Sequence, residues 1–230
     1  MKVLMKELCP PVVWNVLRRV RASMVARKAA LSDGREQDLG VYWNEEMATV
    51  LETWGDGNVW DEIRLLLVNC EGKVLDIACG TGKTMWLLQP FDALQVEGCD
   101  ISDMLIEKAV HRGIPREALR VCDATDLPYA NDEFDYSYSI GSLEHFTEDG
   151  IEKFAAEANR VTRIASFHMM PTSRSGRDEG WLKTHQSFFN SSTDWWESRL
   201  GRYFSDVLVF DSRWEDTLSV GKWFVCKAKR

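Results

Sequence analysis

Three aspartates and a glycine-rich turn have the residue types and spacing best suited to chemistry. The turn lies in the stretch VLDIACGTGKT, where Asp76 precedes Gly80 and Gly82. Further along, LQVEGCD ends in Asp100 and VCDATDLPY contains Asp123. Each aspartate follows or ends an apolar run that we predict to be a strand. A parallel sheet would bring all three to the edge at which such sheets bind ligands.

The spacing of the glycines limits which nucleotide this edge can bind. A phosphate-cradling P-loop needs a glycine five positions ahead of Gly-Lys-Thr, and Ile77 occupies that place. A dinucleotide turn needs a third glycine where Met85 stands. The sequence therefore disfavours ATP or GTP and makes NAD a second choice.

Composition excludes several other classes of function. The 230 residues are 45% hydrophobic and carry a net charge of −8, which predicts one globular core and disfavours a nucleic-acid substrate. No apolar run is long enough to span a bilayer and no signal peptide is evident, so we expect a cytoplasmic protein. The six cysteines and four histidines lack metal-ligand spacing, so we expect buried thiols and no bound metal.

The first 28 residues differ in charge from the rest of the chain. Seven basic side chains against one glutamate give this segment +6, and −8 minus +6 leaves −14 for the remainder. Apolar residues recur at helical spacing after Pro10 and Pro11. Such a basic amphipathic helix either lies on an anionic membrane surface or covers the domain or a partner subunit.

From residue 73 onward, short apolar runs alternate with helical patterns. We predict strands at 74–78, 94–99, 118–122, 134–140, 163–169, 206–210 and 222–228. We predict helices at 42–54, 59–69, 82–89, 103–111, 148–161 and 193–200. This alternation is typical of an α/β fold with a parallel sheet between two helical layers.

Four ordered motifs, VLDIACGTG, VEGCDIS, VCDATDLPY and FDYSYSIGSLEH, resemble those of class I S-adenosylmethionine-dependent methyltransferases. The resemblance implies a Rossmann-like seven-stranded sheet of order 3-2-1-4-5-7-6 with strand 7 antiparallel. It divides the chain into an N-terminal helical extension (1–58) and a methyltransferase domain (59–230). The family's first motif glycine is Ala78 here.

The resemblance also implies S-adenosyl-L-methionine as the cofactor. It would place Asp76, Ala78, Gly80 and Gly82 around the methionine portion and Asp100 with Ile101 at the ribose. It would place Asp123 and Ala124 at the adenine ring. The alternatives from the residues alone are that the glycines serve only the turn, that Asp76 caps the turn, that Asp100 caps a helix and that Asp123 is a solvated strand end.

The methyl acceptor is less well defined by the sequence. The leader resembles those of methyltransferases encoded with bacterial surface-polysaccharide enzymes, which implies a sugar hydroxyl and a role in polysaccharide biosynthesis. His145 is the first candidate for the base that removes the hydroxyl proton, and His185 is the second. The segment 171–192 is expected to form part of the acceptor pocket, and Trp60 either packs in the core or closes over the cofactor.

Other functions stay open at this point. The runner-up is an N- or O-methyltransferase of secondary metabolism or of a protein side chain. An NAD-dependent oxidoreductase and a catalytically silent binding subunit are further alternatives. The sequence does not define the oligomeric state.

Overall fold

A single seven-stranded sheet organises the part of the chain that the structure describes. The computed structural model describes residues 45–183 and 186–230. The strands of this sheet are β1 (Gly72–Ile77), β2 (Leu94–Asp100), β3 (Leu119–Val121), β4 (Phe134–Ile140), β5 (Thr162–Ser173), β8 (Asp206–Glu215) and β9 (Ser219–Lys227). Their order is β3-β2-β1-β4-β5-β9-β8, and β9 is antiparallel to both of its neighbours. The predicted order, with its antiparallel seventh strand, is confirmed.

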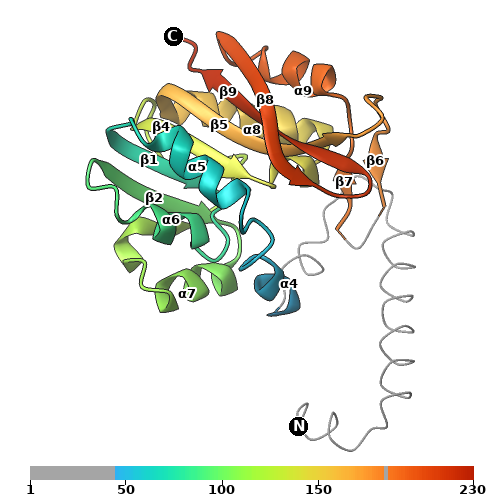
Figure 1. The fold of residues 1–230 in the computed structure, drawn as a ribbon. Coiled ribbons are helices and arrows are strands. Elements are labelled where there is room, and N and C mark those ends of the chain that lie inside the picture. The colour runs from blue at the N-terminus through green and yellow to red at the C-terminus, as the bar shows by residue number, and fades with distance from the viewer. Residues whose placement is uncertain (1–44, 184–185) are drawn as a thin grey trace, which may run out of the picture.

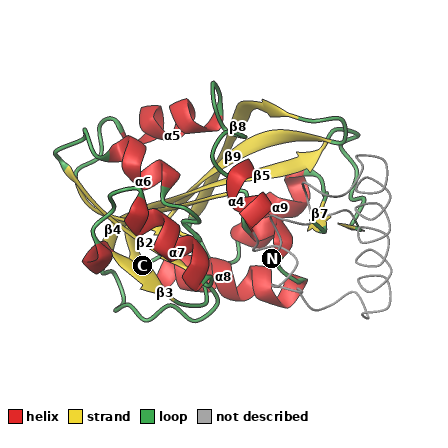
Figure 2. Cartoon of the chain, turned by 90° about the horizontal axis from the view of Figure 1, so that it is seen from below, coloured by secondary structure: helices red, strands yellow, loops and turns green. Residues whose placement is uncertain are grey.

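Helices cover both faces of the sheet (Figures 1 and 2). They are α4 (Glu45–Val50), α5 (Val59–Leu67), α6 (Lys83–Leu88), α7 (Asp103–His111), α8 (Glu148–Val161) and α9 (Thr193–Leu200). One core cluster joins α5 and α6 to the sheet, and another joins α8 and α9 to the opposite face. A third cluster, with Met85, Ile106 and Ala109, joins α6 and α7.

Local signals begin several of these helices at the predicted residues. The hydroxyl of Ser102 accepts a hydrogen bond from the Leu105 N–H at the start of α7, and Thr147 accepts one from Gly150 at the start of α8. These bonds satisfy backbone donors that have no partner within the helix. Because α7 begins directly after β2 and α8 shortly after β4, the capping residues lie at the ligand-binding edge of the sheet.

Several predicted boundaries differ from the structure; strand β8, for example, continues to Glu215 where 206–210 was predicted. Within the range 42–54 only α4 is helical among the described residues, and turns follow it because Gly55 and Gly57 interrupt the chain. Strand β5 continues to Ser173 because β9 pairs with it from Ala165 to Ser173. A short hairpin of β6 (Trp181–Leu182) and β7 (Phe188–Phe189) follows β5 and was not predicted.

The residues before α5 pack over the glycine turn. Arg112 donates a hydrogen bond from Nε to the Thr81 carbonyl (2.9 Å), and its guanidinium also pairs with Glu52. A Cβ atom on Gly80 would lie 3.4 Å from the Leu51 side chain. Trp60 is buried in an edge-to-face contact with Trp54, with the ring centroids 5.1 Å apart, so the core alternative for Trp60 is confirmed.

Candidate active site

The turn after β1 uses left-handed backbone conformations at alternate residues. Ala78, Gly80 and Gly82 have φ angles of 61°, 55° and 67°. A Cβ atom on Gly82 would lie 2.9 Å from the Cβ of Ala109 and 3.1 Å from Cγ1 of Ile114, so α7 can pack against the turn only where no side chain is present. Ala78 adopts the same conformation with a Cβ, which strains the backbone by about 1 kcal/mol.

The missing third glycine of a dinucleotide turn is compensated from the neighbouring strand. Met85 on α6 is buried, and its sulfur would lie 2.5 Å from a Cβ atom on Gly98 of β2. The close approach of helix and sheet therefore relies on a glycine in the strand instead of one in the helix. This arrangement explains why the turn lacks the dinucleotide spacing while keeping tight helix packing.

Asp76 lies behind the turn in the protein interior. Its Oδ2 accepts hydrogen bonds from the Thr84 hydroxyl (2.8 Å) and the Tyr138 hydroxyl (2.9 Å). Burial raises the pKa of Asp76 to about 7, against the lowering effect of these two bonds. Asp76 thereby links β1, β4 and α6, so in this structure it supports the shape of the turn from within.

Asp100 holds the turn from the neighbouring strand and also faces open space. Its Oδ2 accepts the Gly80 N–H (2.9 Å) and its Oδ1 accepts the Ser102 N–H (2.9 Å). Burial raises the pKa of this carboxyl to about 6. A carboxylate has about four lone-pair sites, so Asp100 keeps accepting capacity toward a ligand. The N-cap of α7 is Ser102, not Asp100.

Asp123 stands at the end of β3 with one oxygen engaged locally. Its Oδ1 accepts hydrogen bonds from the backbone N–H and the hydroxyl of Thr125, both at 2.8 Å. Its Oδ2 therefore stays available on an exposed side chain. The adjacent Ala124 is buried, whereas Ile101 leaves 39% of its surface exposed beside the same opening.

These strand ends surround a cavity of about 410 Å³. Residues from the turn after β1, the end of β2 and the loop after β3 line one side, and residues of the β4 exit and of α8 line the other. They include Ala78, Cys99, Asp100, Ile101, Cys122, Asp123, Ala124, Thr125, Ser142, His145, Phe146 and Thr147. Asp76, Gly80 and Gly82 do not line it. The structure thus brings the predicted ribose and adenine residues together with His145, while the turn glycines and Asp76 support them from behind.

His145 lines this cavity, and its ring is held in place by the segment after β5. Its Nδ1 donates a hydrogen bond to the Ser187 carbonyl (3.0 Å), because a carbonyl can only accept. In the neutral ring this leaves Nε2 as the basic atom. Burial lowers the pKa of His145, which the bond to Ser187 partly offsets, so the ring is uncharged at neutral pH.

Glu144 is a buried acidic residue that the sequence analysis did not single out. Its Oε1 lies 3.8 Å from His145 Nε2, and its Oε2 has no hydrogen-bond partner among the described residues. Burial raises the pKa of Glu144 to about 8, so it is largely protonated at neutral pH. The residues around Glu144 in the sequence are mixed polar and apolar, so its burial has no clear sequence signal.

The segment 171–192 forms the side of the site next to His145. The Ser187 carbonyl holds the His145 ring, and the Ser173 N–H donates to the Ser191 carbonyl (2.9 Å). Phe189 stacks on Trp195 of α9 with ring centroids 5.4 Å apart, which anchors the hairpin. His185, the second candidate base, lies outside the described residues. His168 is instead buried within the sheet, hydrogen-bonded on both ring nitrogens by serines.

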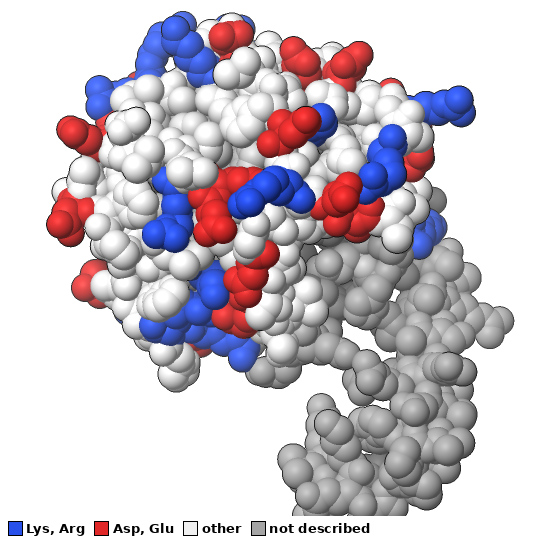
Figure 3. Space-filling model, in the orientation of Figure 1, with Lys and Arg blue, Asp and Glu red and all other residues white. Residues whose placement is uncertain are grey.

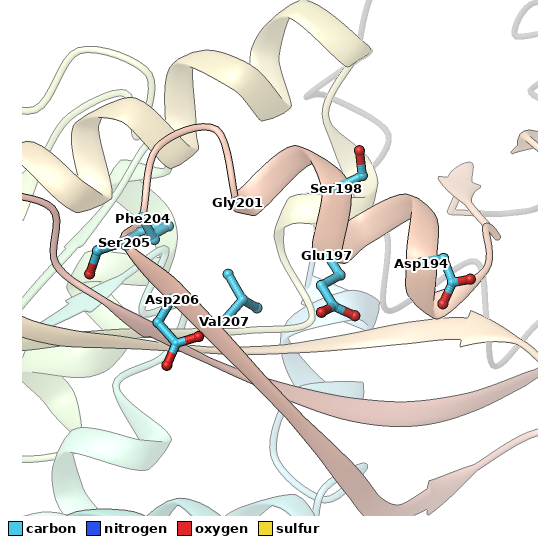
Figure 4. A pocket seen from close by; sticks show the side chains of 8 residues that line it. All are labelled: Asp194, Glu197, Ser198, Gly201, Phe204, Ser205, Asp206 and Val207. Carbon is cyan, nitrogen blue, oxygen red and sulfur yellow. The ribbon is translucent and has the colours of Figure 1, made fainter.

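A second hollow lies far from these groups (Figure 4). It is bordered by the end of α9 and the start of β8, with Asp194, Glu197 and Asp206 around it. Asp206 pairs in register with Lys227, which also pairs with Ala165 at the beginning of β5. The hollow therefore lies at the opposite end of the strands from His145.

Two features are absent from the described residues. No group of three or more His, Cys, Asp or Glu side chains could hold a metal ion in this part of the chain. Across residues 45–183 and 186–230 no helix is long and apolar enough to cross a membrane. The basic N-terminal segment lies outside these ranges.

Comparison with known proteins identifies the fold and the class of enzyme. Residues 74–164 match the family described as a methyltransferase domain. The chain carries a class I S-adenosylmethionine-dependent methyltransferase domain. Its cofactor is S-adenosylmethionine.

Individual relatives match over part of their length. The chain is 28% identical to the 27-O-demethylrifamycin SV methyltransferase of Amycolatopsis mediterranei over 46% of this chain and 41% of that protein. It is 37% identical to the probable tRNA methyltransferase 9B of Homo sapiens over 38% of this chain and 18% of that protein. The chain thus spans less than half the length of these two curated relatives.

A solved structure shows the same fold. The phosphoethanolamine N-methyltransferase 2 of Haemonchus contortus, in complex with phosphomonomethylethanolamine and S-adenosylhomocysteine, superposes with a TM-score of 0.64 at 15% identity. The match covers 82% of this chain and 58% of that one.

The residues of the methyltransferase cavity fit an adenosyl cofactor. Asp100 offers a buried carboxylate with spare accepting capacity, as a ribose diol requires. Ile101 and Ala124 present apolar surface beside it, and Asp123 retains a free oxygen for an exocyclic amine. The cavity volume lies within the range of small-molecule sites.

Proposed function

We propose that the chain transfers the methyl group of S-adenosylmethionine to a hydroxyl oxygen of a small molecule. The cofactor supplies an electrophilic methyl group on a sulfonium whose departure leaves a neutral thioether. The protein therefore has no departing anion to stabilise, and its work is alignment and removal of the acceptor's proton. Holding two reactants in line contributes on the order of 7 to 11 kcal/mol.

The position of His145 is the observation that carries this proposal. The bond to Ser187 directs a neutral ring whose Nε2 can take a proton at the cavity wall. A hydroxyl is a weak nucleophile that gains most from such a base, by roughly 10²- to 10⁴-fold. An amine acceptor has less need of this arrangement, so a base beside the cavity favours O-methylation.

The class of acceptor is proposed from charge and from a relative's name. The 27-O-demethylrifamycin SV methyltransferase acts, by its name, on an O-demethylated small molecule. A hydroxylated secondary metabolite or a sugar hydroxyl fits a cavity of this size, and the sugar agrees with the resemblance of the leader to polysaccharide-locus methyltransferases. A methylated product from neither class would refute this choice of acceptor.

A tRNA acceptor is the alternative suggested by the second relative. The net charge of −8 opposes it, because tRNA binding relies on many Lys and Arg contacts. On the face shown in Figure 3, basic and acidic side chains alternate without a continuous basic stripe. Methylation of tRNA that weakens steeply with added salt would favour the alternative over a small molecule.

A labelled-cofactor assay tests the proposal. The chain is incubated with S-adenosylmethionine carrying a deuterated methyl group and a panel of sugars, phenols, macrocyclic alcohols and amines. Mass spectrometry with fragmentation then locates the label. We expect an O-methyl product whose rate falls by roughly 10²-fold or more in His145→Gln, with His111→Gln, an exposed histidine on α7, as the matched control. Label found only on nitrogen would contradict the proposal.

A further inference from the structure

Two cysteines lie in the wall of the cofactor cavity, each directly before an aspartate of the proposed cofactor site. Cys99 precedes Asp100 in β2, and Cys122 precedes Asp123 after β3. Cys99 pairs in register with Arg120, two residues before Cys122. Cys122 follows β3 directly, and its backbone N–H donates to the Asp100 carbonyl (3.0 Å), so the two cysteines lie beside each other in the wall of the cavity.

The two thiols interact, and their pKa values shift in opposite directions. A hydrogen bond from Cys99, assisted by the positive charge of Arg120, lowers the pKa of Cys122 despite the opposing effect of burial. The same bond, together with burial, raises the pKa of Cys99. Cys122 is half-buried and Cys99 fully buried. A thiol of lowered pKa beside a second thiol is the arrangement of oxidation-sensitive pairs.

The other described cysteines do not share this environment. Cys70 lies outside the cavity, and burial raises its pKa. Cys226 is buried in the core on the far side of the sheet order, and burial also raises its pKa. Cys79 is buried beneath the turn, with its pKa raised well above the ordinary value by burial and by Asp76. Cys122 is thus the described thiol best suited to react.

We propose that Cys99 and Cys122 form an oxidation site at which an intrachain disulfide, made by reaction with hydrogen peroxide, closes the cavity to the cofactor. The Cys122 thiolate attacks one peroxide oxygen, the O–O bond breaks, and the departing hydroxide takes up a proton to become water. The resulting sulfenic acid is attacked by the Cys99 sulfur, which loses its proton as the second water leaves. Two thiols are oxidised and one peroxide is reduced to two waters.

The disulfide would act on the cofactor through the adjacent carboxylates. A bond between the two sulfurs shifts the backbone that carries Asp100 and Asp123, the residues assigned to the ribose and the adenine. This step rests on the assignment of the cofactor to this cavity and not on the identity of the acceptor. Loss of one hydrogen bond to a charged group weakens binding by roughly tenfold or more.

The test compares the reduced and the peroxide-treated full chain. Peptide mapping by mass spectrometry should find a Cys99–Cys122 linked peptide after treatment. Calorimetry should show S-adenosylhomocysteine binding weakened by roughly tenfold or more, with recovery after dithiothreitol. S-adenosylhomocysteine added beforehand should protect Cys122 from alkylation by iodoacetamide.

Matched variants distinguish the effect of oxidising Cys99 and Cys122 from the effect of oxidising other thiols. Cys70→Ser, outside the cavity, should retain both the linked peptide and the reversible loss of binding. Cys99→Ser and Cys122→Ser, each compared with itself before and after peroxide, should form no linked peptide and show a smaller loss.

Three results would overturn the proposal. The first is two unlinked thiols after treatment, and the second is a linked chain that binds S-adenosylhomocysteine as tightly as before. The third is a reduced, folded chain that does not bind this ligand, which would overturn the cofactor assignment as well. Failure to find a hydroxyl acceptor would refute the proposed function alone, because no acceptor takes part in this test.

Discussion

The proposed cofactor region (residues 72–124) and the proposed acceptor region (residues 141–183 and 186–192) meet where His145 lines the cavity, but they are built differently. In the cofactor region, carboxylates accept backbone N–H groups from nearby turns, as Asp100 does from Gly80 and Ser102. In the acceptor region, polar groups pair over long separations, as His145 does with Ser187. A region held by local turns can keep one cofactor geometry while a region held by tertiary contacts adapts to different acceptors.

The two regions also bury titratable groups of opposite sign. Burial raises the pKa of Asp76 and Asp100, whereas burial lowers the pKa of His168 to about 3. Each group is held in its neutral form more strongly in the folded than in the unfolded chain. The stability of the two regions should therefore respond in opposite directions to pH.

Acidification should give the largest difference between the contributions of the two regions to the free energy of unfolding. Between pH 6.5 and about 3 the unfolded chain protonates His168 and the folded chain does not, so the free energy of unfolding falls by up to about 1.4 kcal/mol per pH unit and about 4 kcal/mol in total. Asp76, with a folded pKa of about 7, acts in reverse: its stabilisation is present at low pH and is lost as the pH rises toward 7.

Urea unfolding from pH 7 to pH 4 measures the His168 contribution. The stability difference between the unsubstituted chain and His168→Asn should shrink as the pH falls. A difference between the unsubstituted chain and His168→Asn that is constant over this range would contradict the burial of a neutral imidazole.

Removing the Asp100 carboxylate should have the next largest effect, which is a loss of S-adenosylhomocysteine binding. Asp100→Ala deletes the proposed ribose acceptor and leaves the Gly80 and Ser102 N–H groups without their partner, so S-adenosylhomocysteine binding should weaken by about 3 kcal/mol, or roughly 100-fold. Calorimetry measures this loss. Asp103→Ala, on the exposed side of α7, is the control, and equal losses in the two variants would remove the special role of Asp100.

Two glycines with similar φ angles differ in how closely other atoms pack against them, so alanine at each position separates the cost of packing from the cost of backbone strain. Gly82→Ala in the cofactor region combines backbone strain with a Cβ contact of 2.9 Å, so we expect a loss of about 3 kcal/mol in stability. Gly176→Ala in the acceptor region has φ +71° but no atom within 4 Å of the new Cβ, so a loss of about 1 kcal/mol is expected. Denaturant midpoints that coincide would show that close packing at Gly82 contributes nothing.

The smallest effect is expected at Ala78, where relief of strain should raise stability. Ala78→Gly removes the Cβ from a residue with φ 61°, and the greater freedom of glycine in the unfolded chain offsets part of the gain. The net increase in the free energy of unfolding should reach at most about 1 kcal/mol. Ala93→Gly, in an exposed turn without positive φ, should instead lower it, and thermal or urea unfolding of both variants distinguishes the two outcomes.

Features that depend on residues close in sequence could be predicted, whereas features that depend on contacts between distant residues could not. The strand order, the strand-end aspartates and the helices after them depend on short-range patterns, and the structure confirms the fold. The β6–β7 hairpin depends on Phe189 stacking on Trp195, and the internal role of Asp76 depends on Tyr138, 62 residues away. The burial of Glu144 likewise arises from tertiary packing, so a sequence pattern alone pointed to His145 without its acidic neighbour.

The central claim is that the strand-end cavity holds the cofactor with its methyl group directed at His145. A crystal structure of the chain with S-adenosylhomocysteine tests it most directly. The ribose hydroxyls should be hydrogen-bonded to Asp100, the adenine should lie between Ile101 and Ala124, and the sulfur should face His145. A ligand bound elsewhere, or bound in this cavity with its ribose turned away from Asp100, would contradict it.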